Sequence, residues 1–481
     1  MIQFLLNQTL VSEENIDPNL TVLNYLRRNQ RRSGTKEGCA SGDCGACTVT
    51  LGRTEQGRMV YETVNSCITF VSALQGKQLI TVEDLKENDR LHSVQQAMVD
   101  CHASQCGFCT PGFVMSLFTL QKNMGAWQHK QAEQALAGNL CRCTGYRPIV
   151  AAARQACEQQ EEDSFRRQEV TTVSRLDALK ERGDEEISAN GNRCLLPITT
   201  EQLAALYAAN PQARLLAGGT DLALRVTQQA EVLPLTIALD RIAELKRCYQ
   251  QDDEIVLGAG ASLSRCYEVL AARIPNFAQM LTRFASQQIR NQGTLGGNIG
   301  NASPVGDTPP MLLALDASLM LQQEGRIRRL PLADFFLSYR KTALREGEFI
   351  RAVRVPEVTG SQFFRAWKVA KRGEDDISAV LGAFMIETDE AGNIRRARLA
   401  FGGMAAIPMR AVRCEQLLTG KPFTTENLER ACAMLEQEFA PVSDFRASAG
   451  YRLLVAKNLL RRYHASFTGE LNLLEVSDYV S

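Results

Sequence analysis

The chain has 481 residues, which is too long for one compact core, because single hydrophobic cores stop growing near ~250 to 300 residues. Its content of 45% apolar and 22% charged residues is typical of globular protein and excludes general disorder. The 54 basic residues balance 54 acidic ones, so no net charge attracts nucleic acid or an anionic membrane. We therefore expect several domains and neither of those partners.

The N-terminus and the cysteine content indicate a cytoplasmic protein. Residues 1–7 lack a basic leader, and no run approaches the ~18 apolar residues of a membrane span. Thiols stay reduced in the cytoplasm, so the fifteen cysteines favour metal ligands or small core residues over disulfides.

Short apolar runs open the chain. Residues 2–11 and 46–51 have the β-branched, apolar character of strands, and residues 21–32 place apolar side chains at helical spacing. Together they predict a small α+β domain over residues 1–76.

A helical pattern follows over residues 77–160. Val94 and Cys101 fall on one helical face, and Pro148 is placed to open a later helix. Residues 161–190 are dense in charge and poor in apolar side chains, so they predict a surface linker.

The rest of the chain alternates strand-like and helical runs. The strand-like runs lie at residues 214–217, 237–239, 255–257, 312–315 and 319–321. With the glycine-rich turns between them, they predict an α/β domain over residues 191–370. Further strands and two helices predict a C-terminal α+β subdomain over residues 371–481. The expected fold class is multidomain α+β.

Four cysteines near the N-terminus have the spacing of a metal centre. Cys39, Cys44 and Cys47 form a C-x4-C-x2-C run, and Cys67 follows after nineteen intervening residues. This is the plant-type 2Fe-2S spacing. Glycines within the run permit left-handed backbone angles and bring N–H groups close to sulfur. Zinc ligands come in pairs with longer gaps, so the pattern favours iron over zinc.

A second group contains one cysteine more than a cluster requires. Its members are Cys101, Cys106, Cys109, Cys141 and Cys143. The spacing of the first three repeats the plant-type run, yet Cys101 also continues an apolar helical face, where a free cysteine is a common core residue. The other four lie in turns that open helices, whose N-termini favour thiolates. The spacing alone leaves the choice open.

Two motifs around these cysteines resemble a known family. Residues 105–115 (QCGFCTPGFVM) and 138–148 (GNLCRCTGYRP) are similar to the second iron-sulfur motif of the molybdenum hydroxylases, which include xanthine dehydrogenases, aldehyde oxidases and carbon monoxide dehydrogenases. The resemblance implies a β-grasp ferredoxin domain before a helical iron-sulfur domain. It also leaves Cys101 out and implies, as ligands of the second 2Fe-2S cluster, Cys106, Cys109, Cys141 and Cys143.

Two glycine-rich segments resemble the FAD-binding loops of the same family. They are residues 215–221 (LLAGGTD) and 293–307 (GTLGGNIGNASPVGD). A strand that ends in Gly-Gly-Thr exposes successive N–H groups to a pyrophosphate, although neither segment is a Rossmann fingerprint or a Walker loop. The residues expected at FAD are Leu216, Ala217, Gly218, Gly219, Thr220, Asp221, Phe284, Thr294, Gly297, Asn298, Asn301, Asp307, Ile350 and Lys368.

Some of these residues have a specific expected role. The side chains of Thr294, Asn298 and Asn301 can donate hydrogen bonds, and Asp307 can accept one from a ribose hydroxyl. The resemblance implies that Phe284 lies against the flavin, Ile350 near the isoalloxazine ring and Lys368 at its polar edge. The acidic residues 374–376 are similar to a family loop beside the flavin, and a solvated turn is the alternative.

The order of domains is most similar to the small subunit of bacterial xanthine dehydrogenases. This resemblance implies a molybdenum cofactor on a separate large subunit and a dimer of heterodimers. Electrons from the hydroxylation of hypoxanthine or xanthine to urate would pass through two 2Fe-2S clusters to FAD and then to NAD+. No residue of this chain is expected to act as a catalytic acid or base.

Two alternatives remain at this point. The chain could serve another molybdenum hydroxylase that acts on an aldehyde or an N-heterocycle, because substrate specificity lies outside the electron-transfer domains. It could also be a stand-alone NADH-dependent iron-sulfur flavoprotein reductase, which would use the same cofactors in the opposite direction.

Overall fold

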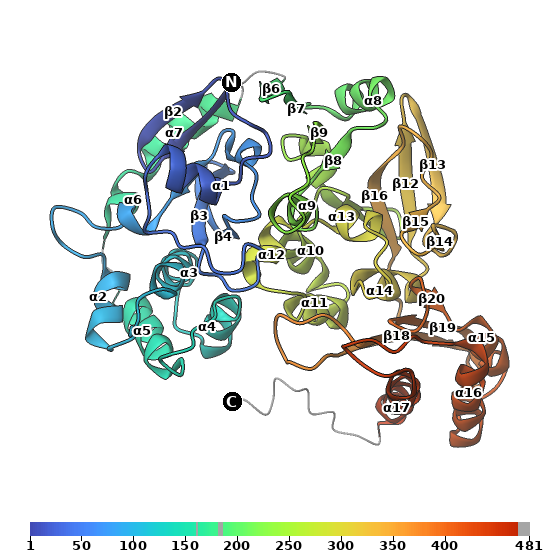
Figure 1. The fold of residues 1–481 in the computed structure, drawn as a ribbon. Coiled ribbons are helices and arrows are strands. Elements are labelled where there is room, and N and C mark those ends of the chain that lie inside the picture. The colour runs from blue at the N-terminus through green and yellow to red at the C-terminus, as the bar shows by residue number, and fades with distance from the viewer. Residues whose placement is uncertain (160–161, 181–185, 470–481) are drawn as a thin grey trace. The chain divides into compact units, whose positions relative to one another are not determined.

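The computed structural model describes residues 1–159, 162–180 and 186–469, and the chain divides into two compact units (Figure 1). Unit 1 comprises Met1–Leu206, Gln212–Ile242 and Ser286–Gly293. Unit 2 comprises Tyr207–Pro211, Ala243–Ala285 and, within the described residues, 294–469. Among the residues described, no helix is both long enough and apolar enough to cross a bilayer.

Unit 1 begins with a five-stranded mixed sheet in the order β2-β1-β5-β3-β4. Its strands are β1 (Ile2–Leu6), β2 (Thr9–Glu13), β3 (Thr48–Glu55), β4 (Arg58–Asn65) and β5 (Gln78–Ile80). Only the β1–β5 pair is parallel. The strand-like residues 2–11 form the β1–β2 hairpin, because Asn7 turns the chain at φ 53°.

One short helical segment packs on this sheet. Helix α1 (Val22–Asn24) starts at Thr21, whose hydroxyl accepts a hydrogen bond from the Asn24 N–H, and it continues as the π-helical turn η1 (Tyr25–Asn29). The ring of Tyr25 meets Phe4 of β1 edge-on, with 5.9 Å between ring centres. The 3-10 turns η2 (Val71–Leu74) and η3 (Val82–Asp84) flank β5. This arrangement confirms the expected β-grasp fold.

A helical bundle follows in the same unit (Figure 1). Its helices are α2 (Ser93–Asp100), α3 (Thr110–Asn123), α4 (His129–Leu136) and α5 (Arg147–Glu158). Prolines in the first turns of α3 and α5 mark their starts, because proline has no N–H to leave unpaired there. The bundle buries Phe113, Phe118 and Ile149 in one core. The helix predicted to begin near Pro148 is confirmed.

The segment expected as a linker differs from that expectation. Residues 161 and 181–185 lie outside the described residues, and the rest contains α6 (Ser164–Arg167), α7 (Glu169–Lys180) and β6 (Glu186–Ala189). Leu176 and Leu179 of α7 pack with Leu5 of β1, and the Arg175 guanidinium donates to the Gln8 carbonyl at 2.7 Å. Two leucines three positions apart are enough to seat a helix whose other face is charged.

A second sheet of unit 1 has the order β6-β7-β9-β8. It contains β6, β7 (Asn192–Leu195), β8 (Arg214–Leu216) and β9 (Leu235–Ala238), and the β7–β9 and β8–β9 pairs are parallel. Helix α9 (Leu222–Thr227) follows β8, and α12 (Gln287–Gln292) also belongs to this unit. Helix α8 (Thr200–Ala209) has residues in both units.

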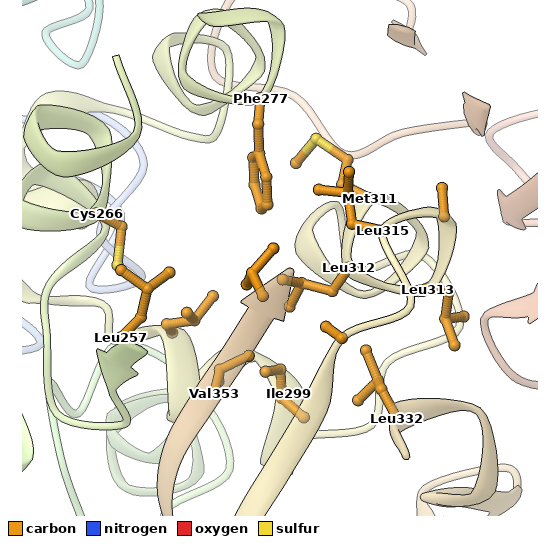
Figure 2. Packing of buried hydrophobic residues seen from close by; sticks show 14 of the residues in the cluster. Leu257, Cys266, Phe277, Ile299, Met311, Leu312, Leu313, Leu315, Leu332 and Val353 are labelled. Atoms are coloured by element: carbon orange, nitrogen blue, oxygen red, sulfur yellow. The ribbon is translucent and has the colours of Figure 1, made fainter. Parts of the chain in front are cut away.

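Unit 2 contains a five-stranded sheet in the order β10-β11-β16-β12-β13. The strands are β10 (Cys248–Gln251), β11 (Glu254–Gly258), β12 (Ser318–Gln323), β13 (Arg326–Pro331) and β16 (Phe349–Pro356), and β14 (Phe336–Ser338) and β15 (Lys341–Thr342) form a separate hairpin. The helical elements are η4 (Ala243–Lys246), α10 (Leu263–Leu270), α11 (Pro275–Thr282), α13 (Leu295–Gly300), α14 (Thr308–Ala314) and η5 (Leu332–Asp334). Figure 2 shows Phe277, Met311, Leu312 and Val353 meeting in the core between sheet and helices.

The strand expected over residues 312–315 is wrong, because this run lies mostly in helix α14. The helix begins after Asp307 and has prolines in its first turn. Every residue of α14 is buried, so the polar face that would mark a helix in the sequence is missing.

The C-terminal part of unit 2 is a four-stranded antiparallel sheet in the order β17-β18-β19-β20. It consists of β17 (Gln362–Val369), β18 (Val380–Thr388), β19 (Ile394–Gly402) and β20 (Met409–Arg410), with helices α15 (Val412–Leu418), α16 (Thr425–Glu438) and α17 (Ala449–Thr468). Val369 of β17 pairs with Val380 of β18. The boundary expected at residue 370 therefore needs correction, because it falls inside a hairpin and the sheet starts at Gln362.

Replacing Phe277 by Ala should destabilise unit 2. The ring is fully buried, and its removal leaves a cavity, so we expect the free energy of unfolding to fall by about 3 to 5 kcal/mol. Fluorescence of Trp367 in a Trp127→Phe background follows unit 2 in a urea titration. Tyr339→Ala is the control, because that side chain is largely exposed, and an equal loss in both variants would contradict the assignment of Phe277 to the core.

Candidate iron-sulfur and flavin sites

The first four cysteines meet at one end of the β-grasp sheet. Cys39, Cys44 and Cys47 lie in the loop before β3, and Cys67 follows β4. The thiol of Cys39 contacts those of Cys44 and Cys67, and Cys47 contacts Cys67. All four predicted ligands are therefore brought together.

Backbone N–H groups surround this sulfur group. The N–H groups of Ser41, Asp43 and Cys44 donate to the Cys39 sulfur at 3.4, 3.3 and 3.4 Å. The thiol contact with Cys44, the contact with Cys67 and the Ser41 N–H together hold the pKa of Cys39 far below that of a free thiol. The contact with Cys39 raises the pKa of Cys44 in turn. The N–H groups of this loop thus stabilise negative charge on the Cys39 sulfur.

The second group forms between the starts of two helices. The sulfurs of Cys106 and Cys143 are 3.6 Å apart, and the thiols of Cys109 and Cys141 also contact each other. Cys109 is the N-cap residue of α3, while Cys141 and Cys143 precede α5. Cys106 and Cys143 are exposed, so this sulfur group reaches the surface of unit 1.

Local hydrogen bonds favour a thiolate at Cys141. Burial opposes the charge, but the Thr144 hydroxyl and the N–H groups of Thr144 and Cys143 lower the pKa of Cys141 to about 7. Burial instead raises the pKa of Cys109 to about 12. A thiolate at Cys141 is the state that binds metal.

Cys101 has a different partner. It is the C-cap residue of α2, and its thiol donates to the Gln155 side-chain oxygen of α5 at 3.4 Å. The plant-type spacing that would include Cys101 is therefore not followed by the fold, which turns this cysteine into a contact between two helices of the bundle.

The thiol geometry suits 2Fe-2S clusters. Each group brings four thiols together, and a 2Fe-2S cluster has two irons that share four thiolates. The eight cysteines fit two 2Fe-2S clusters, one at each group.

The first FAD-like loop lies in unit 1. Strand β8 ends at Leu216, and Ala217, Gly218, Gly219 and Thr220 lead to Asp221, the N-cap residue of α9. A Cβ on Gly218 would lie 1.8 Å from the Gln292 carbonyl oxygen, and Gly219 has φ 76°. Only glycine fits both positions, so the loop offers a bare backbone of the kind that binds a pyrophosphate.

The second loop lies in unit 2 and is held from within. The Thr294 hydroxyl accepts from the Gly297 N–H at 3.1 Å, and the Asn301 N–H donates to the Gly297 carbonyl at 3.0 Å. The Asn298 side-chain oxygen accepts from the Thr308 hydroxyl at 2.6 Å. The structure thus uses Thr294 and Asn298 to shape the loop, a role that the sequence did not separate from FAD binding.

Asp307 and Lys368 form a buried ion pair in unit 2. The Lys368 ammonium lies 2.8 Å from one Asp307 oxygen, and the Ser378 hydroxyl donates to the other at 2.5 Å. Lys368 also donates to the Arg283 carbonyl at 3.1 Å. The sequence treats Asp307 and Lys368 as separate FAD contacts, and it offers no sign of Ser378, because a single serine has no spacing pattern. Removing one partner would leave an uncompensated buried charge.

The other predicted flavin residues also lie in unit 2. Phe284 follows α11 and packs against the core, and the Ile350 side chain of β16 lies 3.8 Å from where a Cβ on Gly300 would be. In the acidic segment, Asp376 accepts from the Arg372 and Ile377 N–H groups at 3.0 and 2.9 Å. Burial opposes ionisation, and these N–H groups still lower the pKa of Asp376.

Comparison with known families gives four consecutive matches. A 2Fe-2S iron-sulfur cluster binding domain matches residues 6–72, and a second 2Fe-2S binding domain matches residues 81–154. An FAD binding domain in molybdopterin dehydrogenase matches residues 188–358, and a CO dehydrogenase flavoprotein C-terminal domain matches residues 365–467.

Known proteins similar to this chain include two long relatives. Xanthine dehydrogenase of Emericella nidulans is 33% identical over 91% of this chain, and xanthine dehydrogenase/oxidase of Rattus norvegicus is 33% identical over 92%. The chain spans only 36% and 37% of the length of these relatives.

Two solved structures are also similar. Carbon monoxide dehydrogenase of Hydrogenophaga pseudoflava aligns with a TM-score of 0.53 and 27% identity, over 56% of this chain and 94% of that chain. Quinoline 2-oxidoreductase of Pseudomonas putida 86 aligns over the same shares with a TM-score of 0.52, and its 24% identity shows a shared fold alone.

The two 2Fe-2S domains and the FAD-binding domain define the chain as an iron-sulfur flavoprotein that transfers electrons. Their order, together with the xanthine dehydrogenase relatives, identifies the family. The chain belongs to the molybdenum hydroxylases and corresponds to their iron-sulfur and FAD portion.

Cysteine variants separate the ligands from Cys101. Cys143→Ala removes one thiol of the Cys106 pair, so iron should fall from about four toward about two per chain and one electron paramagnetic resonance signal of the reduced protein should disappear or change. Cys101→Ala should keep both signals, because its thiol contacts Gln155. Loss of a cluster signal in Cys101→Ala would refute this ligand set.

Gly218→Ala should weaken FAD binding. The added Cβ would collide with the Gln292 carbonyl and displace the loop, so we expect FAD affinity to fall at least about tenfold, or ~1.4 kcal/mol. Titration of the flavin-free chain with FAD measures the change. Gly325→Ala is the matched control, because a Cβ there meets no atom within 4 Å, and equal affinities in both variants would exclude the loop from the FAD site.

Proposed function

We propose that the chain is the electron-transfer subunit of a xanthine dehydrogenase. In this proposal a molybdenum cofactor on a separate large subunit hydroxylates hypoxanthine and xanthine to urate, and NAD+ accepts the electrons. The expected assembly is a dimer of heterodimers in the cytoplasm.

One arrangement in unit 1 carries the proposal, because it holds both cysteine groups and the first FAD loop in a row. The Leu140 N–H, one residue before Cys141, donates to the Cys44 carbonyl at 2.9 Å. On the other side of the first group, the Gln228 amide that ends α9 donates to the Cys39 and Ala40 carbonyls at 3.1 and 2.9 Å. The second group, the first group and the FAD loop are thus successive neighbours.

A further contact joins the first cysteine group to the FAD loop. A Cβ on Gly219 would lie 3.5 Å from the Phe70 ring and 3.7 Å from the Ile68 carbonyl oxygen. Ile68 and Phe70 lie one and three residues after Cys67 and are buried, so the FAD loop packs against the segment that carries this cysteine.

The cofactors explain why such a row is useful. Cysteine-bound 2Fe-2S clusters carry single electrons, whereas FAD holds two and delivers them as a hydride. The eight cysteines would bind the clusters, and the glycine loop of unit 1 would bind the FAD pyrophosphate. Electron transfer through these cofactors needs no catalytic acid or base from the chain.

The substrate and acceptor are inferred from the relatives. Both long relatives are named xanthine dehydrogenases or dehydrogenase/oxidases, and the portion of each that this chain does not match has room for a molybdenum domain. Since the chain has no Rossmann fingerprint, we expect NAD+ to bind at the flavin rather than at a separate dinucleotide fold.

The native complex tests this function. We expect a molybdenum-containing subunit to co-purify and xanthine to drive NAD+ reduction, measured by absorbance of NADH. In complexes that contain Cys143→Ala, this activity should fall at least about tenfold, because electron transfer through the second cluster is lost. Oxidation of NADH by a dye that reacts with the flavin should persist, because it does not need the clusters.

Other outcomes would assign a different function. Turnover of an aldehyde or an N-heterocycle without xanthine would assign the chain to another molybdenum hydroxylase. NADH-dependent reduction of a protein acceptor, by a preparation without molybdenum, would make it a stand-alone reductase and refute the proposal.

A further inference from the structure

Four buried polar side chains meet between the two cysteine groups of unit 1. They come from four separate elements: Thr48 from β3, Ser116 from α3, Asn139 from the loop after α4, and Gln288 from α12. None is more than 3% exposed. A buried polar group that is not hydrogen-bonded destabilises the fold, so such a cluster must be closely arranged to persist.

Asn139 uses both ends of its amide. Its NH2 group donates to the Gly45 carbonyl at 3.0 Å and to the Thr48 hydroxyl at 3.2 Å. Its oxygen accepts from the Ser116 hydroxyl at 2.7 Å and from the Gln288 amide at 3.1 Å. With both ends engaged, Asn139 is fixed in one orientation.

Gln288 contributes a donor and leaves its acceptor unused. Its NH2 group reaches Asn139 and also lies 3.2 Å from the Thr48 hydroxyl. Within the described residues its oxygen has no hydrogen-bond partner, and a Cβ on Gly138 would lie 2.2 Å from that oxygen. A fully buried amide that gives up one hydrogen bond is unusual, and here it gains close contact with the loop that holds Asn139.

These four side chains lie where few covalent bonds and one hydrogen bond separate the first cysteine group from the second. Gly45, which accepts from Asn139, stands between Cys44 and Cys47, and Asn139 stands two residues before Cys141. The Leu140 N–H donates to the Cys44 carbonyl. One hydrogen bond and the backbone of Leu140 therefore connect Cys44 to Cys141, and electrons tunnel better along bonded atoms than across a gap.

We propose that Asn139 and Gln288 form an amide pair that positions the two cluster-binding loops for electron transfer between them. The inference rests on the proposed function, since it requires both clusters to be bound. The clusters held by the two groups would exchange single electrons, with no transfer of an atom or a proton. Asn139 and Gln288 act by holding the Leu140–Cys44 hydrogen bond, so they are positioning residues.

The same pair connects this junction to the FAD loop of unit 1. Gln288 lies on α12, whose last residue, Gln292, presents the carbonyl against which Gly218 packs. On the same helix, the Ile289 side chain lies 3.2 Å from where a Cβ on Gly42 would be. One short helix therefore contacts the first cysteine loop, the second cysteine loop through Gln288, and the FAD loop.

Two variants test the amide pair in the complete protein with its cofactors. Asn139→Asp keeps the shape and the acceptor but removes the NH2 group, and Gln288→Met keeps the volume but removes the donor. We expect both to retain about four irons per chain. We expect the rate of electron transfer between the clusters to fall severalfold, because displaced loops would break the Leu140–Cys44 hydrogen bond. The magnetic interaction between the two reduced clusters, seen as splitting in electron paramagnetic resonance spectra, should also change.

Gln121→Met is the matched control. Gln121 is also a buried amide of unit 1, but it donates to the Ala156 carbonyl at 2.6 Å and to the Ser93 hydroxyl at 3.0 Å, away from the cysteine loops. It should keep the wild-type splitting and rate.

Wild-type splitting and rate in both amide variants would overturn the proposal. Loss of iron from both, with iron retained in the Gln121→Met control, would also overturn it, because the pair would then serve cluster retention instead of positioning. A wild-type chain with zinc or a single cluster signal would instead refute the proposed function, independently of these variants.

Discussion

The two cysteine groups can be neighbours only because backbone packs directly on backbone where their loops meet. A Cβ on Gly45 would lie 2.2 Å from the Gly138 carbonyl oxygen, and a Cβ on Gly112 would lie 2.2 Å from the Gly45 carbonyl oxygen. No other residue fits at these positions without moving the chain. The β-grasp sheet and the helical bundle are thereby joined at the point where each holds its sulfur atoms, and the row of redox sites in unit 1 depends on this close approach.

The same closeness explains the electrostatics of the sulfur groups. The tight loop places backbone N–H groups near sulfur, as those of Ser41 and Asp43 lie at Cys39, and so stabilises negative charge there. The second group instead lies at the starts of two helices and keeps Cys106 and Cys143 exposed. The two groups therefore differ in solvent access, which is one of the factors that separate the potentials of otherwise identical clusters.

The residues predicted to bind FAD are of two kinds, a buried ion pair in unit 2 and backbone glycines in unit 1. In unit 2, Asp307 and Lys368 neutralise each other in a buried site that Ser378 completes, so the charges expected to face FAD also stabilise the fold around it. In unit 1, Gly218 and Gly219 bring only backbone.

Local patterns predicted the elements that have a local cause. Prolines marked the starts of α3 and α5, short apolar and β-branched runs marked strands such as β8, β9, β11 and β12, and the C-x4-C-x2-C run marked the first cysteine group. Sequence patterns failed to predict a helix where all of its residues are buried or where few apolar residues mark its buried face. Helix α14 is apolar on every side and was taken for a strand, and α7 was hidden because only Leu176 and Leu179 mark its buried face among charged residues.

The sequence by itself determined the spacing of the first four cysteines and the two glycine loops, because their residues lie close together along the chain, and its spacing left the second set of cysteines open. Tertiary structure alone decided which thiols pair, that Cys101 faces Gln155, and that Asn139 meets Gln288 across 149 positions. Such contacts have no fixed spacing, since they depend on how separate elements pack. The family resemblance could select Cys106, Cys109, Cys141 and Cys143, but only the fold supplies the hydrogen bond that joins them to the first group.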